Sequence, residues 1–451
     1  MYGVRVYMGE KSFVCVDDMQ IMTESTLDPM VLAEEAKRIV REEEDWRAKK
    51  TLNLIASENV MSPVARALYN SDFQHRYAEG EVGERYYEGV RYADDIEALC
   101  ERSLSQLVRV DYVNVKPLSG AQANLAVFFA FAKPGDHVMS VDLPSGGHIS
   151  YREFGAAGCR GLVVDNIPYN SESLGFELEL LRSKLRELRG KLTIVTLGGS
   201  LFLFPHPVRD IARILEEEGM RSEVVLHYDA AHVFGLVVGG KFQDPVAEGA
   251  DVISSSTHKT FPGPQGGVLL GARLTDKQKS SLRKAVFPGL VSNHHLHRLP
   301  ALAYTIAEMA RFGHDYASQV VSNAKRLAKA LDESGFRVLG KEKGYTESHQ
   351  VALDVQPYGG GAPVSLALAQ ADIITNKNLL PGENPRNSRT PAGIRLGVQE
   401  LTRLGMNEAE MERIAELFTQ VVINRENPES VRHAVHALRS EFTEVRYTFV
   451  S

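Results

Sequence analysis

The feature that most constrains the fold is an alternation of apolar, strand-like runs with helical segments between about residues 95 and 271. The strand-like runs lie at 111–118, 136–143, 161–167, 192–198, 223–228, 250–254 and 267–271. Between two of them, Val208, Ile211, Ala212 and Leu215 recur at helical spacing. Alternating strands and helices predict a mostly parallel sheet with helices on both faces, and near-continuous apolar runs are typical of strands buried on both sides.

The pattern changes after about residue 300. Helical stretches at 301–335 and 406–440 enclose short strand-like runs at 336–340, 350–355 and 393–398, and 381–391 has the composition of a loop. A helical segment also opens at residues 26–28 and runs through Arg47. We therefore predict an N-terminal extension and arm (1–75), a large domain (76–305) and a smaller C-terminal α+β domain (306–451). Residues 1 to about 22 match no pattern.

Charge and composition exclude several classes of function. The chain has 51 Lys and Arg against 58 Asp and Glu, a net charge of -7, without the basic clusters that nucleic-acid binding requires. No apolar run approaches the roughly 18 residues of a membrane span, and no signal peptide is recognisable, which favours the cytoplasm. Cys15, Cys100 and Cys159 lie far apart, so no disulfide framework or metal site is predicted.

A carboxylate and a lysine follow two neighbouring strands of the predicted sheet. Asp229 ends the run that begins at Val224, and Lys259 follows the hydroxyl-rich stretch 254–257. Ligands bind at this end of the strands in open α/β sheets. Taken alone, Asp229 is better explained as the cap of the next turn, and Lys259 can be a surface lysine whose amine reaches the solvent. Together they match the needs of pyridoxal phosphate (PLP), which requires a lysine for its aldehyde and a carboxylate for its ring nitrogen.

A third feature suits the cofactor phosphate. Residues 117–124 (PLSGAQAN) lie between a predicted strand and a predicted helix, and their small side chains leave the first backbone N–H groups of the helix accessible. Helix N-termini bind anions through these groups and the helix dipole. A phosphate cradle, a ring-nitrogen partner and a Schiff-base lysine form the minimum set for a PLP enzyme.

An ordered series of motifs resembles the serine hydroxymethyltransferase family from about residue 52 to 420. The motifs are 54–59 (LIASEN), 77–80 (YAEG), 85–89 (RYYEG), 119–124 (SGAQAN), 146–148 (GGH), 229–232 (DAAH), 257–260 (THKT) and 393–395 (GIR). The resemblance implies a fold-type I PLP-dependent transferase that moves the hydroxymethyl group of serine to a reduced pterin, leaving glycine. It also implies a homodimer whose active sites are shared between subunits.

The resemblance further implies a role for each matching residue. Catalytic roles fall on Lys259 (Schiff base), Asp229 (ring nitrogen), His148 (stacked on the ring), His232 (beside the substrate), Glu79 (acid–base group) and Tyr87. The cofactor would also be held by Ser119, Gly120, Ala121, Ser200, His258 and, from the other subunit, Tyr77. Ser57 and Arg395 would bind the amino-acid carboxylate, with Glu79 and Tyr87 nearby, and Leu143, Gly147, His148 and Asn378 would approach the pterin.

Two departures bear on the cofactor and the pterin. Ala121 stands where many relatives carry serine, and residues 287–295 (FPGLVSNHH) replace a glycine-rich run, as in archaeal members. The pterin is therefore either tetrahydrofolate or a modified archaeal pterin. A threonine or allo-threonine aldolase that uses PLP without a pterin is the alternative enzyme. A PLP-free scaffold protein is the non-enzymatic alternative, and Lys259, Asp229 and Arg395 together argue against it.

Overall fold

The computed structural model describes residues 28–449, and the chain divides into two compact units, Met1–Lys50 and Thr51–Ser451. The described part of the first unit is mainly helix α1 (Pro29–Arg47). The Asp28 carboxylate caps this helix by accepting from the amide of Met30 at 2.9 Å, which agrees with the predicted opening near Asp28. The segment from residue 1 to about 22 lies outside the described residues.

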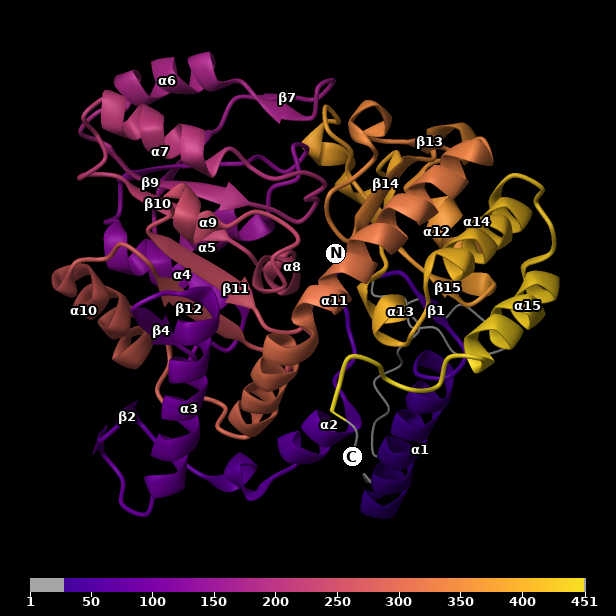
Figure 1. The fold of residues 1–451 in the computed structure, drawn as a ribbon, viewed down its shortest axis with the longest axis horizontal. Helices are drawn as coiled ribbons and strands as arrows, with labels where there is room; N and C mark the ends of the chain where they lie inside the picture. Colours follow the sequence, from indigo (N-terminus) through magenta and orange to yellow (C-terminus); the bar gives the residue numbers. More distant parts are fainter. Residues whose placement is uncertain (1–27, 450–451) are drawn as a thin grey trace. The chain divides into compact units, whose positions relative to one another are not determined.

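Within residues 28–449, the second unit contains a seven-stranded sheet whose strands all overlap the predicted runs (Figure 1). In order across the sheet they are β4 (Tyr112–Asn114), β12 (Gly267–Gly271), β11 (Val252–Ser256), β10 (Val225–Asp229), β9 (Leu192–Gly198), β5 (His137–Ser140) and β6 (Val163–Asn166). Strands β11, β10, β9, β5 and β6 pair in parallel, and β12 is antiparallel to both of its neighbours. The predicted mostly parallel sheet is confirmed.

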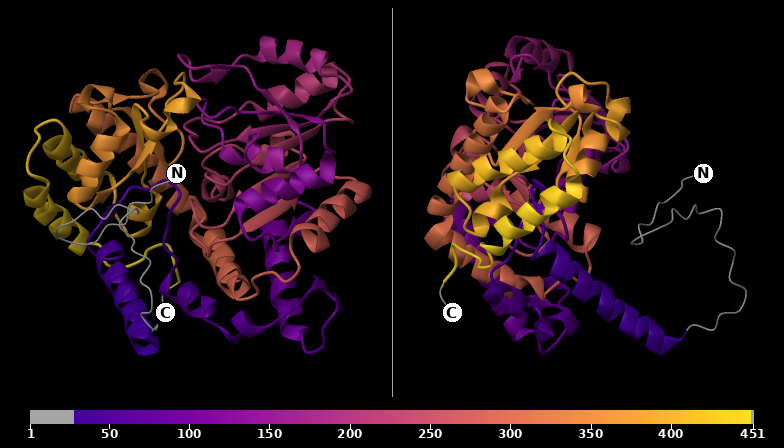
Figure 2. Two further views of the ribbon diagram at one scale, coloured as in Figure 1. Left: turned by 180° about the vertical axis from the view of Figure 1, so that it is seen from behind. Right: turned by 90° about the vertical axis from the view of Figure 1, so that its right-hand side faces the viewer.

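Helices cover both faces of this sheet (Figures 1 and 2). Alternate strand residues feed two core clusters: Val225 packs with Phe128 of α4, whereas Leu226 packs in the cluster that contains Ile211 of α7. The helices of this region are α2 (Pro63–Tyr69), α3 (Arg91–Val108), α4 (Gly120–Phe131), α5 (Ala156–Cys159), α6 (Leu178–Glu187), α7 (Val208–Glu217), α8 (Phe234–Val238), α9 (Pro245–Glu248), α10 (Asp276–Lys284) and α11 (Arg298–Glu333).

A smaller α+β region follows α11, as predicted. Its antiparallel sheet runs in the order β13 (Arg337–Val338), β14 (Gln350–Asp354), β17 (Gly393–Gly397) and β16 (Asn376–Asn378). Its helices are α12 (Gly361–Gln370), α13 (Gln399–Arg403), α14 (Glu408–Val422) and α15 (Pro428–Ser440). The single helical stretch expected at 406–440 is wrong, because Asn427 caps a new helix whose first residue is Pro428.

Three strand pairs complete the described secondary structure. They are β1 (Leu52–Asn53) with β15 (Ile373–Ile374), β2 (Gly80–Glu81) with β3 (Glu84–Arg85), and β7 (Tyr169–Asn170) with β8 (Gly175–Phe176). The β1–β15 pair ties the start of the second unit to the C-terminal region. The predicted domain boundaries at 75 and 305 stay predictions.

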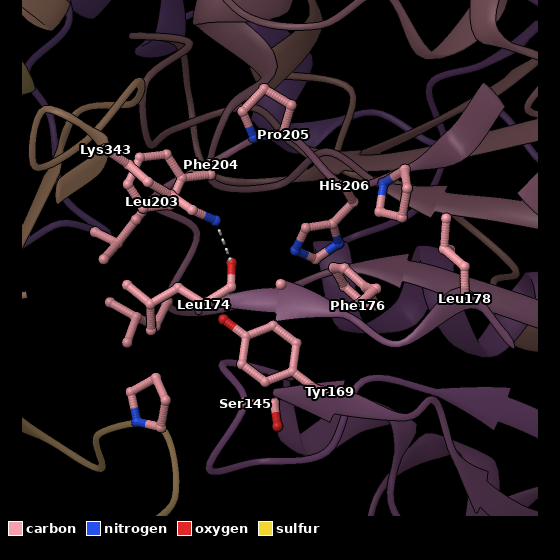
Figure 3. A pocket seen from close by; sticks show the side chains of 14 residues that line it. Ser145, Tyr169, Leu174, Phe176, Leu178, Leu203, Phe204, Pro205, His206 and Lys343 are labelled. Atoms are coloured by element: carbon pink, nitrogen blue, oxygen red, sulfur yellow. Dashed lines mark hydrogen bonds between the residues drawn. The ribbon is translucent and has the colours of Figure 1, made fainter. Parts of the chain in front are cut away.

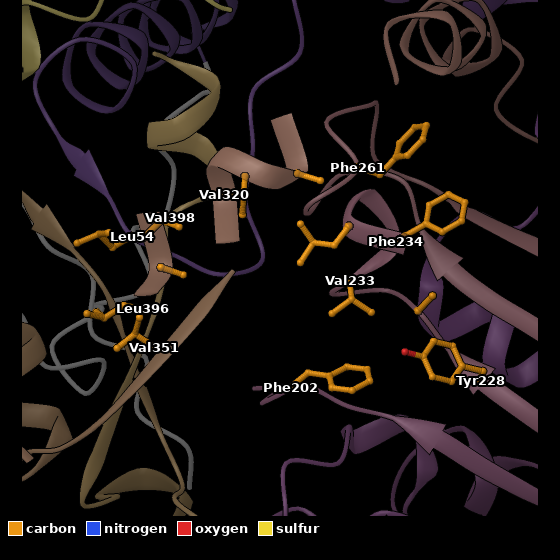
Figure 4. Packing of buried hydrophobic residues seen from close by; sticks show 14 of the residues in the cluster. Leu54, Phe202, Tyr228, Val233, Phe234, Phe261, Val320, Val351, Leu396 and Val398 are labelled. Carbon is orange, nitrogen blue, oxygen red and sulfur yellow. The ribbon is translucent and has the colours of Figure 1, made fainter. Parts of the chain in front are cut away.

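One core cluster joins the two regions of the second unit. Phe234 and Phe261 beside the large sheet, Val320 of α11, and Val351 and Leu396 of the small sheet all belong to it (Figure 4). The small sheet is therefore packed against the large sheet beside the carboxyl end of β10. Among the described helices, none has the length and apolar character needed to span a bilayer.

Candidate active site

Asp229 lies at the carboxyl end of β10 and is buried. Its Oδ2 accepts hydrogen bonds from Asn124 Nδ2 at 2.8 Å and from the Tyr151 hydroxyl at 2.6 Å, and its Oδ1 accepts from the amide of Ala231 at 2.9 Å. Burial alone would raise the pKa of Asp229, but His148, these donors and Lys259 outweigh it, so the pKa lies below its usual value. The carboxylate is ionised and fixed in orientation.

Asn124 connects Asp229 to the neighbouring strand. Its side-chain oxygen accepts from Ser254 Oγ at 2.5 Å, while its amide also donates to Ser150 Oγ at 2.9 Å. Sequence reasoning assigned no role to Asn124 or Tyr151. An amide inside the apolar helix α4 was the available signal for Asn124, because a buried polar group needs partners.

Lys259 follows β11, the parallel neighbour of β10 in which Ser254 pairs with Asp229. Thr260 Oγ1 donates to the carbonyl of His232 at 2.7 Å, and Asn59 Nδ2 donates to the carbonyl of Lys259 at 2.6 Å, so the chain is anchored at Lys259 and Thr260. Burial lowers the pKa of Lys259 to about 8, with Asp229 acting in the opposite direction and Arg395 in the same one. Asp229 and Lys259 thus lie at the carboxyl ends of neighbouring strands, as the sequence predicts.

Two histidines flank this pair. His148 Nδ1 lies 2.8 Å from Ser150 Oγ, and burial lowers the pKa of His148. Burial also holds the pKa of His232 well below its ordinary value. Gln350 Nε2 lies 2.9 Å from His232 Nδ1, and its Oε1 accepts from the amide of Phe202 at 2.6 Å, which fixes the amide orientation. The neutral His232 therefore carries its proton on Nε2.

The residues predicted to cradle a phosphate surround the start of α4. Ser119 caps the helix by accepting from the amide of Gln122 at 3.1 Å, and the first helical amides have no partner within the helix. A Cβ on Gly120 would lie 3.3 Å from the amide nitrogen of Ser256, so a glycine allows the helix to approach β11 closely. Burial lowers the pKa of His258 to about 4, and its buried Nδ1 has no hydrogen-bond partner among the described residues. These donors fit a phosphate group.

Arg395 lies in β17 and is buried. Its Nη1 donates to the carbonyl of Ser200 and its Nε donates to Asn376 Oδ1 at 3.3 Å. Burial lowers the pKa of Arg395 to about 10, and none of the ion pairs within residues 28–449 involves it. A buried guanidinium without a carboxylate partner is suited to bind a substrate carboxylate.

The loop that carries Ser57 packs against the same strand. The amide of Gly397 donates to the carbonyl of Leu54 at 2.9 Å, and a Cβ on Gly397 would lie 2.4 Å from the Cα of Ala56. His349 Nε2 lies 3.1 Å from the carbonyl of Ala56, and its ring stacks on His232 with centroids 5.7 Å apart. Ser57 therefore belongs to the neighbourhood of Arg395 and His232.

The loop predicted to approach the pterin, which contains Leu143 and Gly147, adjoins Ser200. The carbonyl of Gly146 accepts from the amides of Ser200 at 2.6 Å and Leu201 at 3.1 Å. Asn378 lies in β16 and pairs with Gly393, two residues before Arg395. The approach of these residues to a pterin stays a prediction.

A pocket of about 190 Å³ lies beside this loop (Figure 3). Tyr169, Leu174, Phe204 and His206 face it, and Lys343 Nζ donates to the carbonyl of Leu174 at 3.3 Å. Lys259, Asp229 and Arg395 do not line it. The pocket is thus separate from the predicted cofactor site.

Glu79, Tyr77 and Tyr87 form a second group. The Tyr87 hydroxyl donates to Glu79 Oε2 at 3.2 Å, and the rings of Tyr77 and Tyr87 meet edge to face at 5.2 Å. Both tyrosines are exposed, at 49% and 43%. None of the contacts within residues 28–449 joins this group to Lys259 or Asp229. One chain therefore brings the predicted site residues together in two places.

Between residues 28 and 449, no three His, Cys, Asp or Glu side chains are arranged to hold a metal ion. The donor set around Asp229, Lys259 and α4 instead fits an aromatic aldehyde that carries a ring nitrogen and a phosphate.

Comparisons with known proteins agree with this chemistry. The family model of serine hydroxymethyltransferase matches residues 31–418. The serine hydroxymethyltransferase of Methanopyrus kandleri is 50% identical over 415 residues, which cover 92% of this chain and 94% of the relative. That of Pyrococcus horikoshii is 48% identical over 414 residues, covering 91% and 95%.

A solved structure has the same fold at lower identity. L-threonine transaldolase from Pseudomonas fluorescens, in its internal aldimine state, superposes with a TM-score of 0.83 at 28% identity, covering 93% of this chain and 94% of that one. The predicted fold-type I architecture and the use of PLP are therefore supported. With the family model matching most of its length, the chain belongs to the serine hydroxymethyltransferase family of PLP-dependent transferases.

Proposed function

We propose that this protein transfers the hydroxymethyl group of serine to a reduced pterin, either tetrahydrofolate or a modified archaeal pterin, giving glycine and the methylene-pterin. The observation that carries the proposal is the placement of Asp229 and Lys259 at the ends of adjacent parallel strands. The buried guanidinium of Arg395, which has no carboxylate partner within residues 28–449, is near enough to contribute to the lowered pKa of Lys259. In the proposed reaction, Lys259 would be the covalent anchor, Asp229 the ring-nitrogen partner and Arg395 the receptor for the substrate carboxylate.

PLP would be held by the side chains described above. Lys259 would bind its aldehyde, Asp229 would hold a proton on its ring nitrogen, and His148 would stack on the ring. When bound, PLP supplies an electron sink for the electrons released at the substrate Cα. The phosphate would be held by Ser119, the amides of Gly120 and Ala121, His258, and Tyr77 of the partner subunit, while Ser200 and His232 would lie near the phenolic oxygen.

The lowered pKa of Lys259 leads to a testable pH dependence. Only the neutral amine attacks an aldehyde, so attachment of PLP to cofactor-free protein should accelerate as the pH rises and level off above about 8. An exposed lysine, titrating near 10.4, would still accelerate well above that pH. Stopped-flow absorbance from pH 6.5 to 10 measures the profile, and a rate still rising tenfold per unit at pH 9.5 would contradict the burial of this amine.

The substrate would be oriented mainly by Arg395. Its guanidinium would pair with the amino-acid carboxylate, assisted by Ser57, and this contact would orient the substrate Cα in the site. His232 would donate its Nε2 proton toward the cofactor or substrate, because Gln350 occupies Nδ1. Glu79 would exchange a proton with the serine hydroxyl as the Cα–Cβ bond breaks, with Tyr87 as its hydrogen-bond partner.

Glu79→Gln tests the acid–base role. The substitution keeps the size of the side chain and removes its proton exchange, so pterin-dependent serine cleavage should fall by roughly 100- to 10,000-fold. Binding of PLP and glycine should be retained because Asp229, Lys259 and Arg395 are untouched. Turnover and cofactor absorbance measure the two effects. Full activity in this variant would show that another group moves the proton.

A homodimer with shared sites would bring the two groups of residues together. A groove of about 850 Å³ is lined by the exposed Tyr77 and Tyr87, by further large side chains such as Tyr92 and Leu99, and by charged ones such as Asp95. Exposed aromatic and aliphatic side chains gathered in one groove suit a subunit contact. Glu79 of one subunit would then face Lys259 of the other. This arrangement explains why one chain alone leaves them apart.

Mixing two inactive variants tests the shared site. In a dimer of one Lys259→Ala chain and one Glu79→Gln chain, one of the two sites would combine the intact Lys259 with the intact Glu79. Random reassociation of equal amounts should therefore recover about a quarter of wild-type activity. If both residues act within one chain, no site is complete and no activity returns. Unfolding and refolding the mixture, with each variant alone as a control, gives the measurement.

The choice of pterin is tested by an activity assay with serine and several reduced pterins. Formation of glycine that depends on one of them supports the proposed function. Pterin-stimulated exchange of the glycine α-proton separates this reaction from that of a threonine aldolase, which needs no pterin. Cleavage of threonine at the same rate with and without every pterin tested would favour the aldolase.

A further inference from the structure

Arg85 is the last residue of the segment 76–85, which carries Tyr77 and Glu79, and its side chain binds the backbone of that segment. The Nη1 of Arg85 donates to the carbonyls of Ala78 at 2.9 Å and Gly80 at 2.7 Å, the two residues that flank Glu79. The Arg85 side chain is only 2% exposed, and its Nε donates to Asp94 Oδ1 at 2.7 Å. The backbone on both sides of Glu79 is therefore attached to one buried guanidinium.

Arg85 is itself held by Glu97 of α3. Glu97 is fully buried, and its carboxylate contacts Arg85 Nη2 at 2.8 Å, Lys116 Nζ at 3.0 Å and His294 Nε2 at 2.7 Å. We call these four residues the Glu97 cluster. Burial alone would raise the pKa of Glu97, but His294 and the two cations lower it to about 2, so it carries a full charge.

Lys116 extends the cluster back to the segment. Its Nζ, which is buried, also contacts Glu81 Oε2 at 2.7 Å, and Glu81 lies two residues beyond Glu79. Burial lowers the pKa of His294, so its imidazole is neutral and contributes an N–H group. The hairpin β2–β3 is thus attached to α3 and to the residues around 294 through buried polar contacts.

Asn293 attaches the other end of the segment. Its Oδ1 accepts from the amide of Ala78 at 2.9 Å, and its Nδ2 donates to the carbonyl of Arg76 at 3.3 Å, so it bridges the backbone around Tyr77. Asn293 is adjacent to His294 of the Glu97 cluster. One dipeptide therefore controls the backbone on both sides of Tyr77 and, through Glu97 and Arg85, on both sides of Glu79.

We propose that Asn293 and the Glu97 cluster are positioning residues that fix Tyr77 and Glu79 for the reaction. The inference rests on the proposed function of Glu79. Buried ion pairs contribute little net stability, because desolvation offsets their attraction, so fold stability alone gives little reason to bury this network. Fixing a proton-transferring carboxylate gives a strong reason, since displacement of a reacting group by about 1 Å can cost 100-fold in rate.

Two variants of the holoenzyme test the proposal: Glu97→Gln, which removes the central charge, and Asn293→Ala, which removes the bridge around Tyr77. We expect kcat for serine with the pterin to fall by roughly 10- to 100-fold, with KM for serine changed less than about twofold because Arg395 and Ser57 are untouched. Amide hydrogen exchange should accelerate in 76–85 and stay unchanged in 224–260. Asn293→Asp, which keeps the acceptor for the Ala78 amide, should restore part of the lost rate.

Glu216→Gln serves as the matched control, because it removes an exposed carboxylate of α7 that makes no ion pair within the described residues. Unchanged amide exchange in 76–85 in both Glu97→Gln and Asn293→Ala would overturn the proposal. A fall in kcat of Asn293→Ala that is accompanied by loss of PLP binding and a lower melting temperature would also overturn it, because it would indicate a purely structural role. The exchange measurement needs no turnover. If the wild-type enzyme used no pterin, the proposed function would fail while the attachment of segment 76–85 could still be judged.

Discussion

Lys259→Ala should lower hydroxymethyl transfer by roughly 1,000-fold or more. The variant loses both the covalent anchor for PLP and the amine that receives the cofactor back after each turnover. The Asp229 side of the site keeps its hydrogen bonds to Asn124 and Tyr151, so the fold should be retained. Steady-state turnover, together with absorbance of bound cofactor, measures the loss.

A second lysine variant provides the control for Lys259→Ala. Lys277 is exposed on α10 and makes no ion pair within residues 28–449, so Lys277→Ala should behave as wild type. Added methylamine should restore part of the activity of Lys259→Ala, because it supplies a free amine where the side chain is missing. Wild-type turnover in Lys259→Ala would rule out this lysine as the anchor.

Asp229→Asn should lower kcat by roughly 100- to 1,000-fold, the loss typical of removing one preorganised group that stabilises the charge developing in the reaction. The asparagine retains the shape of the side chain but cannot hold a proton on the ring nitrogen of PLP. Its amide would also face the donors Asn124 and Tyr151, which require an acceptor. PLP should still attach to Lys259, so the variant should be coloured and nearly inactive.

Asp251→Asn is the matched control for Asp229→Asn. Asp251 is also buried, but it lies at the amino end of β11, away from Lys259, and pairs with Arg221 at 2.6 Å. Its loss should lower the melting temperature and leave turnover per bound cofactor unchanged. Equal turnover of the Asp229 and Asp251 variants would refute a special role for the 229 carboxylate.

The central sheet was predictable because its strands are long apolar runs separated by amphipathic helices. Both Val225 and Leu226 are buried, in different core clusters, which is why β10 reads as a continuous apolar run. Some of the short elements carry no such signal. β15 and β16 contain two and three residues, and α12 has Gly361 as its first residue, so none was predicted.

The candidate site was predictable only where its residues form local motifs. Asp229 and Lys259 each follow a recognisable strand, and the small residues at the start of α4 lie between a strand and a helix. Tyr151 and Gln350 were missed, since their contacts with Asp229 and His232 cross 78 and 118 positions of the chain. Side chains that act across such separations become visible only once the chain is folded.

The most direct test of the central claim is reduction of the PLP-bound protein with sodium borohydride, followed by proteolysis and mass spectrometry. Reduction makes the bond between cofactor and lysine permanent. The modification is expected on the peptide that contains Lys259, in stoichiometric amount and at no other lysine. Modification at a different lysine, with Lys259 left free, would contradict it.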